Sequence, residues 1–349
     1  MIEQYLQDLE ERLDPAVEEE LLAAWTDFTE GRWQGGIFSP RRSAAAPAGR
    51  DWPHVLVDDT LDDFELMALQ QLEGCSAALE QASGAIMAVR ANYGTSILPS
   101  LFGAELFIMD RDTDTLPTSW PLAGGVETIR QLVERGVPDF APDTLGGRTL
   151  AMGRYFNDLF ASYPKVRQHV HVYHPDLQGP MDICELLWGS SLFLDIVDEP
   201  ELARDLLALI TATYERFLDA WHEIAPPVPE RAVHWSMQHR GAIMLRDDSA
   251  MNFSPAMFEE FIEPYDQQLL DRFGGGAIHF CGRGEHYIHR LPAMRGLHAI
   301  NMSQPEYNDM ETIYRNTVDR DVRIIGLPRQ TAQEALTAGR DLRGGVHCW

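Results

Sequence analysis

The sequence predicts an α/β fold, a (β/α)8 TIM-type barrel with an N-terminal helical and loop extension. Short apolar strand segments alternate with helical segments through the second half of the chain, which implies a parallel sheet with right-handed crossovers. The length of 349 residues suits one barrel with insertions, and the apolar fraction of 45% supplies a large core. We expect residues 1–60 to form the extension and residues 61–349 to form the barrel.

The first half of the chain contains the extension and the less regular elements. Apolar residues three to four positions apart predict a helix near the N-terminus, and Gly, Pro and Arg residues predict a long loop over 35–53. The remaining patterns predict helices over 61–83, 126–135 and 149–162, and strands over 85–90 and 169–173.

The second half has the clearest alternation of strands and helices. Apolar runs predict strands at 231–236, 242–245, 276–280, 298–302 and 322–326. Helical periodicity covers the segments 181–188, 201–224, 255–273, 284–294 and 308–319. No Gly-x-Gly-x-x-Gly element follows an early strand, which weakens a dinucleotide-binding alternative.

The charge balance excludes some classes of partner. The 54 acidic and 28 basic side chains give a net charge of -26, which repels phosphate backbones and anionic lipid, so we expect no nucleic acid and no membrane as partners. No apolar run approaches the roughly 18 residues that cross a bilayer, and the acidic N-terminal segment lacks the features of a signal peptide. We therefore expect a cytoplasmic protein.

The sequence has four cysteines, too few for a disulfide framework in a reducing compartment. Cys75 and Cys184 lie on apolar helical segments and are expected in the core. His279 and Cys281 lie two residues apart on a predicted strand, so their side chains face the same side at its carboxyl end. Imidazole and thiolate suit zinc, and Cys348 is the candidate third ligand. The alternative is that all three are core or tail residues.

Other polar residues follow predicted strands and are candidates for the same site. Asp247 and Asp248 come directly after a strand, where a carboxylate orients a substrate or approaches a metal. A helix-flanking acidic turn is an equally good interpretation. We expect further substrate contacts from residues in strand-end loops, namely Asn92, Tyr93, Gln178 and Gln304.

The segment His279-Phe280-Cys281-Gly282 with a later cysteine resembles the His-x-Cys…Cys zinc motif of cobalamin-dependent methyltransferases in the uroporphyrinogen decarboxylase superfamily. Three more segments are similar to that superfamily in the same order: its Gly-Pro turn, its acidic loop with a Ser-Pro helix entry, and a later strand end (178–182, 247–265 and 300–306). The resemblance covers roughly residues 165–349 and implies a (β/α)8 barrel with zinc held by His279, Cys281 and Cys348.

In those methyltransferases the metal binds the thiol of an acceptor such as coenzyme M and lowers its pKa, so that a thiolate attacks a methyl group on a corrinoid. The resemblance thus implies a zinc-dependent methyltransferase that moves a methyl group from a corrinoid or a small methylated donor to a thiol, with a corrinoid protein as partner. One alternative is a decarboxylase or lyase acting on a tetrapyrrole-type acid. The chain lacks the Arg-Gln-Ala-Gly-Arg signature of such decarboxylases, and Pro40-Arg41-Arg42 is its nearest approach. The other alternative is a non-catalytic barrel that binds a corrinoid or a small ligand.

Overall fold

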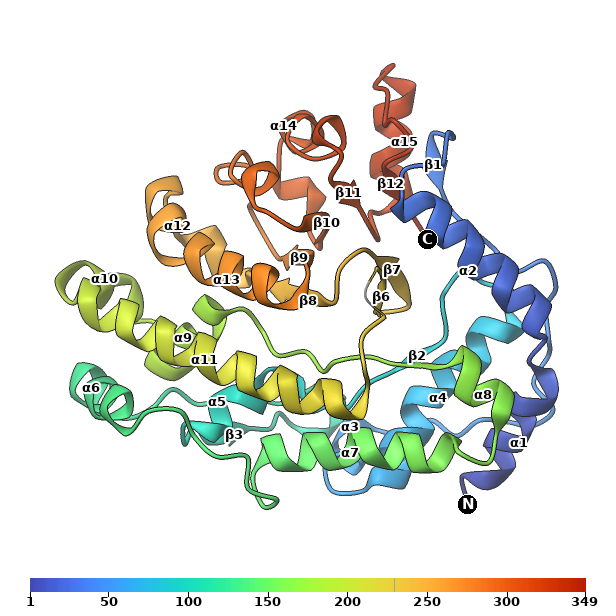
Figure 1. The fold of residues 1–349 in the computed structure, drawn as a ribbon, viewed down its shortest axis with the longest axis horizontal. Coiled ribbons are helices and arrows are strands. Elements are labelled where there is room, and N and C mark those ends of the chain that lie inside the picture. Colours follow the sequence, from blue (N-terminus) through green and yellow to red (C-terminus); the bar gives the residue numbers. More distant parts are fainter. Residues whose placement is uncertain (229) are drawn as a thin grey trace.

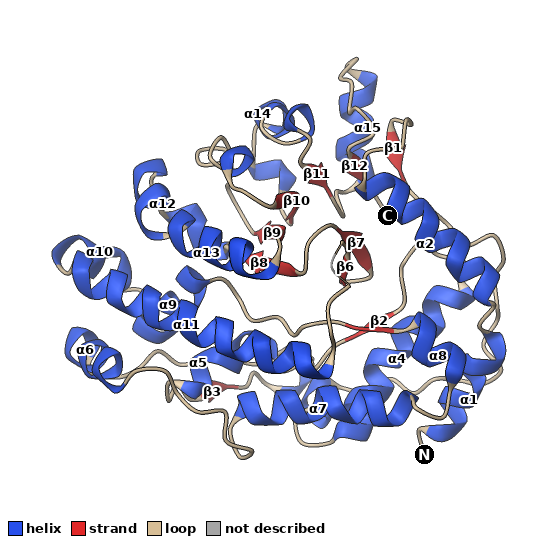
Figure 2. Ribbon diagram, viewed as in Figure 1, coloured by secondary structure: helices blue, strands red, loops and turns tan. Residues whose placement is uncertain are grey.

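Parallel strands with helices packed around them make up the computed structural model, which describes residues 1–228 and 230–349. The α/β class predicted from the sequence is confirmed. Figure 2 shows the helices around the outside of the molecule and the strands toward its middle. Six strands form one wholly parallel sheet, in the order β1 (Ile37–Phe38), β12 (Val346–His347), β11 (Arg323–Ile324), β10 (Leu297–Met302), β9 (Gly276–Phe280) and β8 (Ile243–Arg246).

The other strands pair in twos. Strands β2 (Ala88–Val89) and β5 (His171–Val172) form a separate parallel pair. Two antiparallel hairpins complete the set, β3 (Leu106–Phe107) with β4 (Thr118–Ser119), and β6 (Ala232–His234) with β7 (Met237–His239). In Figure 1, β8 to β12 and β1 follow a curve through the upper half of the view, and β2 lies below them.

Two breaks separate the parallel pair from the six-stranded sheet, so strand pairing does not form one continuous ring. Between β5 and β8, the Met244 N–H donates to Nε2 of His174 at 3.1 Å, and a side chain thus takes the place of a backbone partner. The turn of the β6–β7 hairpin reaches the segment before β2, where the Ile86 N–H donates to the carbonyl of Ser236 at 2.9 Å. A side-chain hydrogen bond thus links the segment after β5 to β8, and a hairpin turn contacts the segment before β2.

Helices pack around the strands. The α-helices are α1 (Glu3–Arg12), α2 (Pro15–Thr29), α3 (Val57–Thr60), α4 (Phe64–Glu80), α5 (Ile97–Leu101), α6 (Gly125–Arg135), α7 (Leu145–Phe160), α8 (Pro164–His169), α9 (Pro180–Trp188), α10 (Leu192–Asp198), α11 (Pro200–Ile224), α12 (Pro255–Phe261), α13 (Glu263–Phe273), α14 (Met310–Arg315) and α15 (Arg329–Thr337). Short 3-10 helices are η1 (Gly94–Ser96), η2 (Arg111–Thr113), η3 (Asp248–Asn252), η4 (Leu291–Ala293), η5 (Pro305–Tyr307) and η6 (Val318–Arg320). Several α-helices begin with a capping Asp or Ser or a first-turn Pro, as at Asp63 and Ser254.

The strands separate two buried apolar clusters, which define the two faces used below. The inner face contributes to one apolar cluster together with Trp25 and Phe28 of α2, through Phe38, Met244, Ala277, Ala299 and Ile325. The outer face packs against the surrounding helices through Ile243, Ile278, Ile300, Ile324 and Val346. Because successive strand residues alternate between these faces, each residue's position in a strand decides which cluster it joins.

Three expectations differ from the structure. Strand β1 lies within residues 1–60 and pairs with β12, so a domain boundary at residue 60 would cut through the sheet. Residues 284–294 form turns and the 3-10 helix η4 rather than an α-helix. The strand expected at 231–236 is instead the first arm of a hairpin whose turn lies at Trp235 and Ser236, which have φ values of 46° and 63°.

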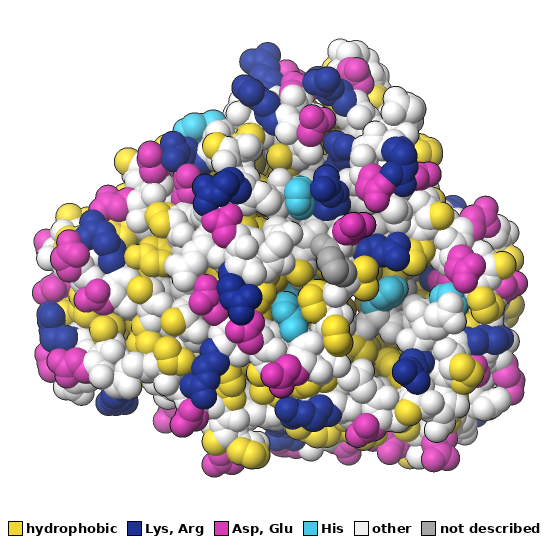
Figure 3. Space-filling view, in the orientation of Figure 1, with side chains coloured by type: hydrophobic (Ala, Val, Ile, Leu, Met, Phe, Trp, Pro, Cys, Tyr) yellow, Lys and Arg dark blue, Asp and Glu magenta, His cyan; other side chains and the backbone are white. Residues whose placement is uncertain are grey.

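Charged side chains are spread over the surface rather than gathered in one patch on the face shown. Figure 3 shows acidic and basic side chains interspersed over one face of the molecule. In the described part of the chain, none of the helices combines the length and apolar character that a bilayer span requires.

Candidate metal centre

The end of strand β9 brings two candidate ligands together. His279 follows Ala277 on the inner face, and Cys281 lies two residues further on the same side. The Cys281 Sγ is 3.4 Å from Nε2 of His279. His279 is 7% exposed, whereas Cys281 is half-buried, so the thiol is the more accessible of the two. The side chains converge, as the period of a β-strand predicts.

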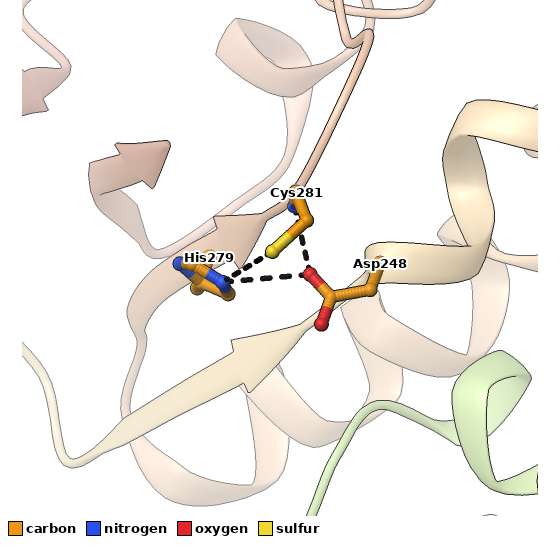
Figure 4. A group of neighbouring side chains, drawn as sticks. All are labelled: Asp248, His279 and Cys281. Carbon is orange, nitrogen blue, oxygen red and sulfur yellow. Dashed lines mark hydrogen bonds and ion pairs between the residues drawn. The ribbon is translucent and has the colours of Figure 1, made fainter. Parts of the chain in front are cut away.

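Asp248 is the third member of this group. It is the first residue of η3, directly beyond the loop residue that follows β8, and its Oδ1 lies 3.4 Å from Nε2 of His279. The same oxygen accepts the backbone N–H of Cys281 at 2.7 Å, which fixes the carboxylate against the end of β9. One ligand atom from each of the three residues lies within 4.8 Å of the other two (Figure 4).

Asn301 sets the tautomer of His279. The two residues are register partners on β10 and β9, and the His279 Nδ1 lies 2.6 Å from the Asn301 Oδ1. The Asn301 Nδ2 donates to the carbonyl of Ile325 at 2.6 Å, so the amide oxygen must face the imidazole and accept the Nδ1 proton. This leaves the Nε2 lone pair of the neutral ring directed toward Asp248 and Cys281. Metal-binding histidines are held in the same way, by a partner on the other ring nitrogen.

The electrostatics of the group favour a cation. Burial lowers the pKa of His279, but hydrogen bonds with Asp248 and Cys281 outweigh burial and raise this pKa to about 9. Burial also acts to raise the pKa of Asp248, and its contacts with His279 and Cys281 hold the pKa below the usual range. Asp248 and Cys281 therefore stabilise a proton on Nε2 of His279, and the same two groups would attract a metal ion at this position.

Helix α9 holds the turn that carries Asp248. The Asp182 carboxylate accepts the backbone N–H of Asp248 at 3.0 Å and that of Ser249 at 2.7 Å. The Ser249 hydroxyl in turn donates to Glu185, one helical turn further along α9. Two carboxylates of one helix therefore position the candidate ligand of another segment.

Trp235 packs against this group from the hairpin turn. Its ring lies 5.0 Å from that of His279, edge to face, and the guanidinium of Arg246 lies over it at 4.5 Å. Arg246 is the register partner of His279 on β8 and pairs with Asp176, as does Arg90. The floor beside His279 is therefore aromatic and charged rather than aliphatic.

Cys348 does not join the group, contrary to the expected ligand set. It follows His347 at the end of β12, where its N–H donates to the carbonyl of Phe38 at 2.9 Å. His347 faces inward against Trp25, so the next residue faces outward, and Cys348 belongs to the outer apolar cluster with Val346 and Tyr314. Burial raises the pKa of its thiol to about 11, which disfavours the thiolate that a metal needs.

Asp247 also points away from the group formed by Asp248, His279 and Cys281. It follows Arg246, an inner-face residue, and its buried carboxylate therefore faces the outer layer beside Asp266 of α13. Burial and the charge of Asp266 raise the pKa of Asp247 well above its ordinary value. Of the two consecutive aspartates proposed from the sequence, the structure brings only Asp248 to the candidate centre.

The four expected substrate-contact residues have different surroundings. Gln178 lines a cavity that Asp248 also lines. Gln304 accepts the N–H of Gly282 at 2.6 Å and so shapes the loop after β9, while the Asn92 amide oxygen accepts from Arg90 at 2.9 Å. Tyr93 lines another cavity beside Arg148, and burial raises its pKa to about 12. Among these four residues, the structure places only Gln178 in a cavity with the candidate centre.

Asn301 and Trp235 were not among the site residues expected from the sequence. A signal existed for Asn301, because it lies on the next predicted strand at a position that can pair with His279. No comparable signal existed for Trp235, since its turn contains no glycine or asparagine at the positive φ positions.

Comparisons with known proteins bear on the fold. No family model matches this chain, and no curated protein matches it. The solved structure of a methyltransferase from Methanosarcina mazei is similar, with a TM-score of 0.60 and 15% sequence identity over 84% of this chain and 81% of that chain. A likeness at this identity establishes a shared fold over most of the chain.

Proposed function

We propose that this protein is a zinc-dependent methyltransferase that moves a methyl group from a corrinoid or a small methylated donor to a thiol. The observation that carries the proposal is the convergence of Asp248, His279 and Cys281, whose ligand atoms lie within 4.8 Å of one another. The fold shared with a methyltransferase of Methanosarcina mazei supports the same reaction class by analogy. A corrinoid-carrying protein is the proposed partner for the methyl donor.

The donor set fits zinc. An imidazole nitrogen, a thiolate and a carboxylate oxygen are all ligands that zinc takes in proteins, and three protein ligands leave a position free, as in catalytic rather than structural zinc sites. The hydrogen bond from Nδ1 of His279 to Asn301 supplies the outer partner that such a site needs. When bound, the ion lowers the pKa of a substrate thiol, so that the nucleophilic thiolate is available near neutral pH.

The residues of this chain would orient the ligands and control access. Asp182 fixes the turn of Asp248, Asn301 fixes the ring of His279, and Trp235 closes the inner side of the group. The half-buried Cys281 faces the accessible side, from which a thiol would approach.

We also propose that the parallel strands β1, β2, β5 and β8 to β12 constitute an irregular (β/α)8 barrel. The candidate centre then lies at the carboxyl ends of its strands, which is where barrel enzymes place their active sites. The hydrogen bond from Met244 to His174 supports closure at the break between β5 and β8.

The arginines nearest to the decarboxylase signature have structural partners. Arg42 is 4% exposed and forms a two-point ion pair with Glu18, and it also donates to the carbonyls of Ser83 and Ala85. Arg41 donates to the carbonyl of Gln81. Arg42 is therefore committed to the fold, which favours methyl transfer over decarboxylation of an acidic tetrapyrrole.

The test is metal analysis combined with an assay of methyl transfer from methylcobalamin to a small thiol. Purified protein should hold about one zinc per chain and transfer methyl groups. His279→Ala should lose the zinc and the transfer together, whereas the control His289→Ala, at an exposed histidine, should keep both. Wild-type protein that binds no zinc, or a zinc-loaded protein that transfers no methyl group, would refute the proposal.

A further inference from the structure

A cavity opens beside the candidate metal centre and reaches Asp248. Its volume is about 430 Å³, and the segment after β2, helix α9 with its preceding turn, and η3 line it. Three acidic side chains contribute to the lining, those of Asp182, Glu185 and Asp248, together with five hydroxyl groups. Burial and the neighbouring aspartates raise the pKa of Asp182 well above its ordinary value, so this residue adds little negative charge to the wall. Among the described residues that line this cavity there is no lysine, arginine or histidine.

Gln178 is the polar residue whose geometry points to a ligand. It is only 6% exposed, and no hydrogen bond joins its side-chain amide to the described residues, although it lines the cavity. Its φ of 63° lies in the left-handed region, which a residue with a β-carbon rarely adopts. The amide atoms keep access to the cavity, where a ligand can form hydrogen bonds with them, and a strained backbone is typical of functional sites.

The backbone next to Gln178 is held firmly. The Gly179 N–H donates to the carbonyl of Arg246 at 2.7 Å, and a β-carbon at Gly179 would lie 2.4 Å from that oxygen. Only glycine therefore allows the chain to approach β8 this closely. This contact fixes the conformation in which Gln178 lines the cavity beside Asp248.

We propose that the cavity beside Asp248 selects a thiol substrate that carries a positively charged ammonium group, an aminothiol. This inference rests on the proposed thiol chemistry and specifies its substrate class. Glu185 and the amide oxygen of Gln178 would accept hydrogen bonds from the ammonium group, with the thiol directed toward the open position of the centre. A cavity lined by carboxylates, in a protein with a net charge of -26, attracts cations and disfavours carboxylate-bearing thiols.

The positive groups of the neighbourhood lie outside this cavity. Arg90 and Arg246 both pair with Asp176, and neither contributes to the cavity lining. These arginines suggest the alternative result of the test. A thiol that bound beside Arg246 would carry a negative group, and 3-mercaptopropionate would then bind more tightly than cysteamine.

The test compares three small thiols on cobalt(II)-substituted protein: cysteamine, 2-mercaptoethanol and 3-mercaptopropionate. The thiolate-to-cobalt absorption band reports binding of each thiol, and the readout is the ratio of the dissociation constants of 3-mercaptopropionate and cysteamine. Glu185→Gln keeps an acceptor for Ser249 but removes the charge, and we expect it to lower this ratio about tenfold. Because the thiols are the same in every variant, the change in the ratio is independent of their intrinsic acidity.

Two further variants complete the design. Gln178→Glu adds a carboxylate to the same wall and should raise the ratio, so the test does not depend on one variant folding. Glu80→Gln, at an exposed position on α4 outside the cavity, should leave the ratio unchanged. A ratio that is the same in wild type and in both cavity variants, or tighter binding of 3-mercaptopropionate in wild type, would overturn the inference alone. If no thiol perturbs the cobalt spectrum, the thiol chemistry itself fails and the substrate class fails with it.

Discussion

The ends of strands β9 and β12 both carry an imidazole and a thiol, but they arrange them differently. On β9, His279 and Cys281 are two residues apart and share the inner face. On β12, His347 and Cys348 are adjacent, so the ring faces inward and the thiol faces the outer helices. The same two residue types can therefore form a joint site on one strand and not on the other, because spacing sets the direction of each side chain.

The two histidines also differ in their electrical surroundings. Contacts with Asp248 and Cys281 raise the pKa of His279 to about 9, whereas burial lowers the pKa of His347 to about 3. His347 lies among Trp25, Phe28 and Phe38, and its Nδ1 accepts the N–H of Gly326 at 3.0 Å. One strand end attracts a cation, and the other is part of an aromatic core.

The largest expected effect separates the two cysteines. Cys281→Ser should reduce bound zinc from about one per chain to nearly none, because it replaces a thiolate ligand by a poor one. Cys348→Ser should leave the zinc content unchanged, since this thiol lies in the outer cluster. Elemental analysis of both variants, with circular dichroism to verify folding, measures the difference. Loss of zinc in a folded Cys348→Ser protein would show that β12 does reach the centre.

The same contrast explains which site residues the sequence could predict. His279 and Cys281 were predictable because a two-residue period needs only the assignment of one strand. The direction of Cys348 was not predictable, because it depends on the exact register of β12 in the sheet. A shift of one residue would turn Cys348 to the inner face and His347 to the outer face. The sequence likewise proposed both Asp247 and Asp248 and could not choose between them.

The sequence likewise predicted some strands of the fold and missed others. The strands of the second half have strong apolar patterns, and the structure contains β8 to β11 close to the expected ranges. Strand β1 was missed because it pairs over two residues within a segment rich in Gly and Pro. The breaks beside β5 and β2 were not predictable from the sequence, because the contacts found next to them come from a histidine side chain and a hairpin turn, whose positions depend on tertiary packing.

A smaller effect should follow from the support of His279. Asn301→Ala removes the acceptor of the Nδ1 proton, and we expect zinc affinity to fall by about 10- to 100-fold. Asn301→Asp keeps an acceptor for His279 but loses the N–H that donates to Ile325, so it separates support of the ring from packing of β10. Competition with a chromophoric chelator measures both affinities. Equal losses in the two variants would contradict the assigned role of the Asn301 oxygen.

The smallest expected effect concerns the pH dependence of stability that His347 contributes. Its pKa is lowered to about 3 in the folded protein, first by burial and then by the charge of Arg329, whereas an unfolded histidine titrates near 6.5. Between these values the unfolded chain binds a proton that the folded chain does not. The free energy of unfolding therefore decreases as the pH falls below about 6.5, by at most about 1.4 kcal/mol per pH unit.

His347→Leu should remove this contribution. The stability advantage of the wild type over the variant should shrink by about 1.4 kcal/mol between pH 7.5 and pH 5.5, measured by urea unfolding at both values. The other buried histidines titrate in both proteins, so their contributions cancel in the difference. A difference that stays constant with pH would mean that His347 can take up a proton in the folded state. The aromatic core at the end of β12 would then resemble the polar end of β9 more closely than its packing suggests.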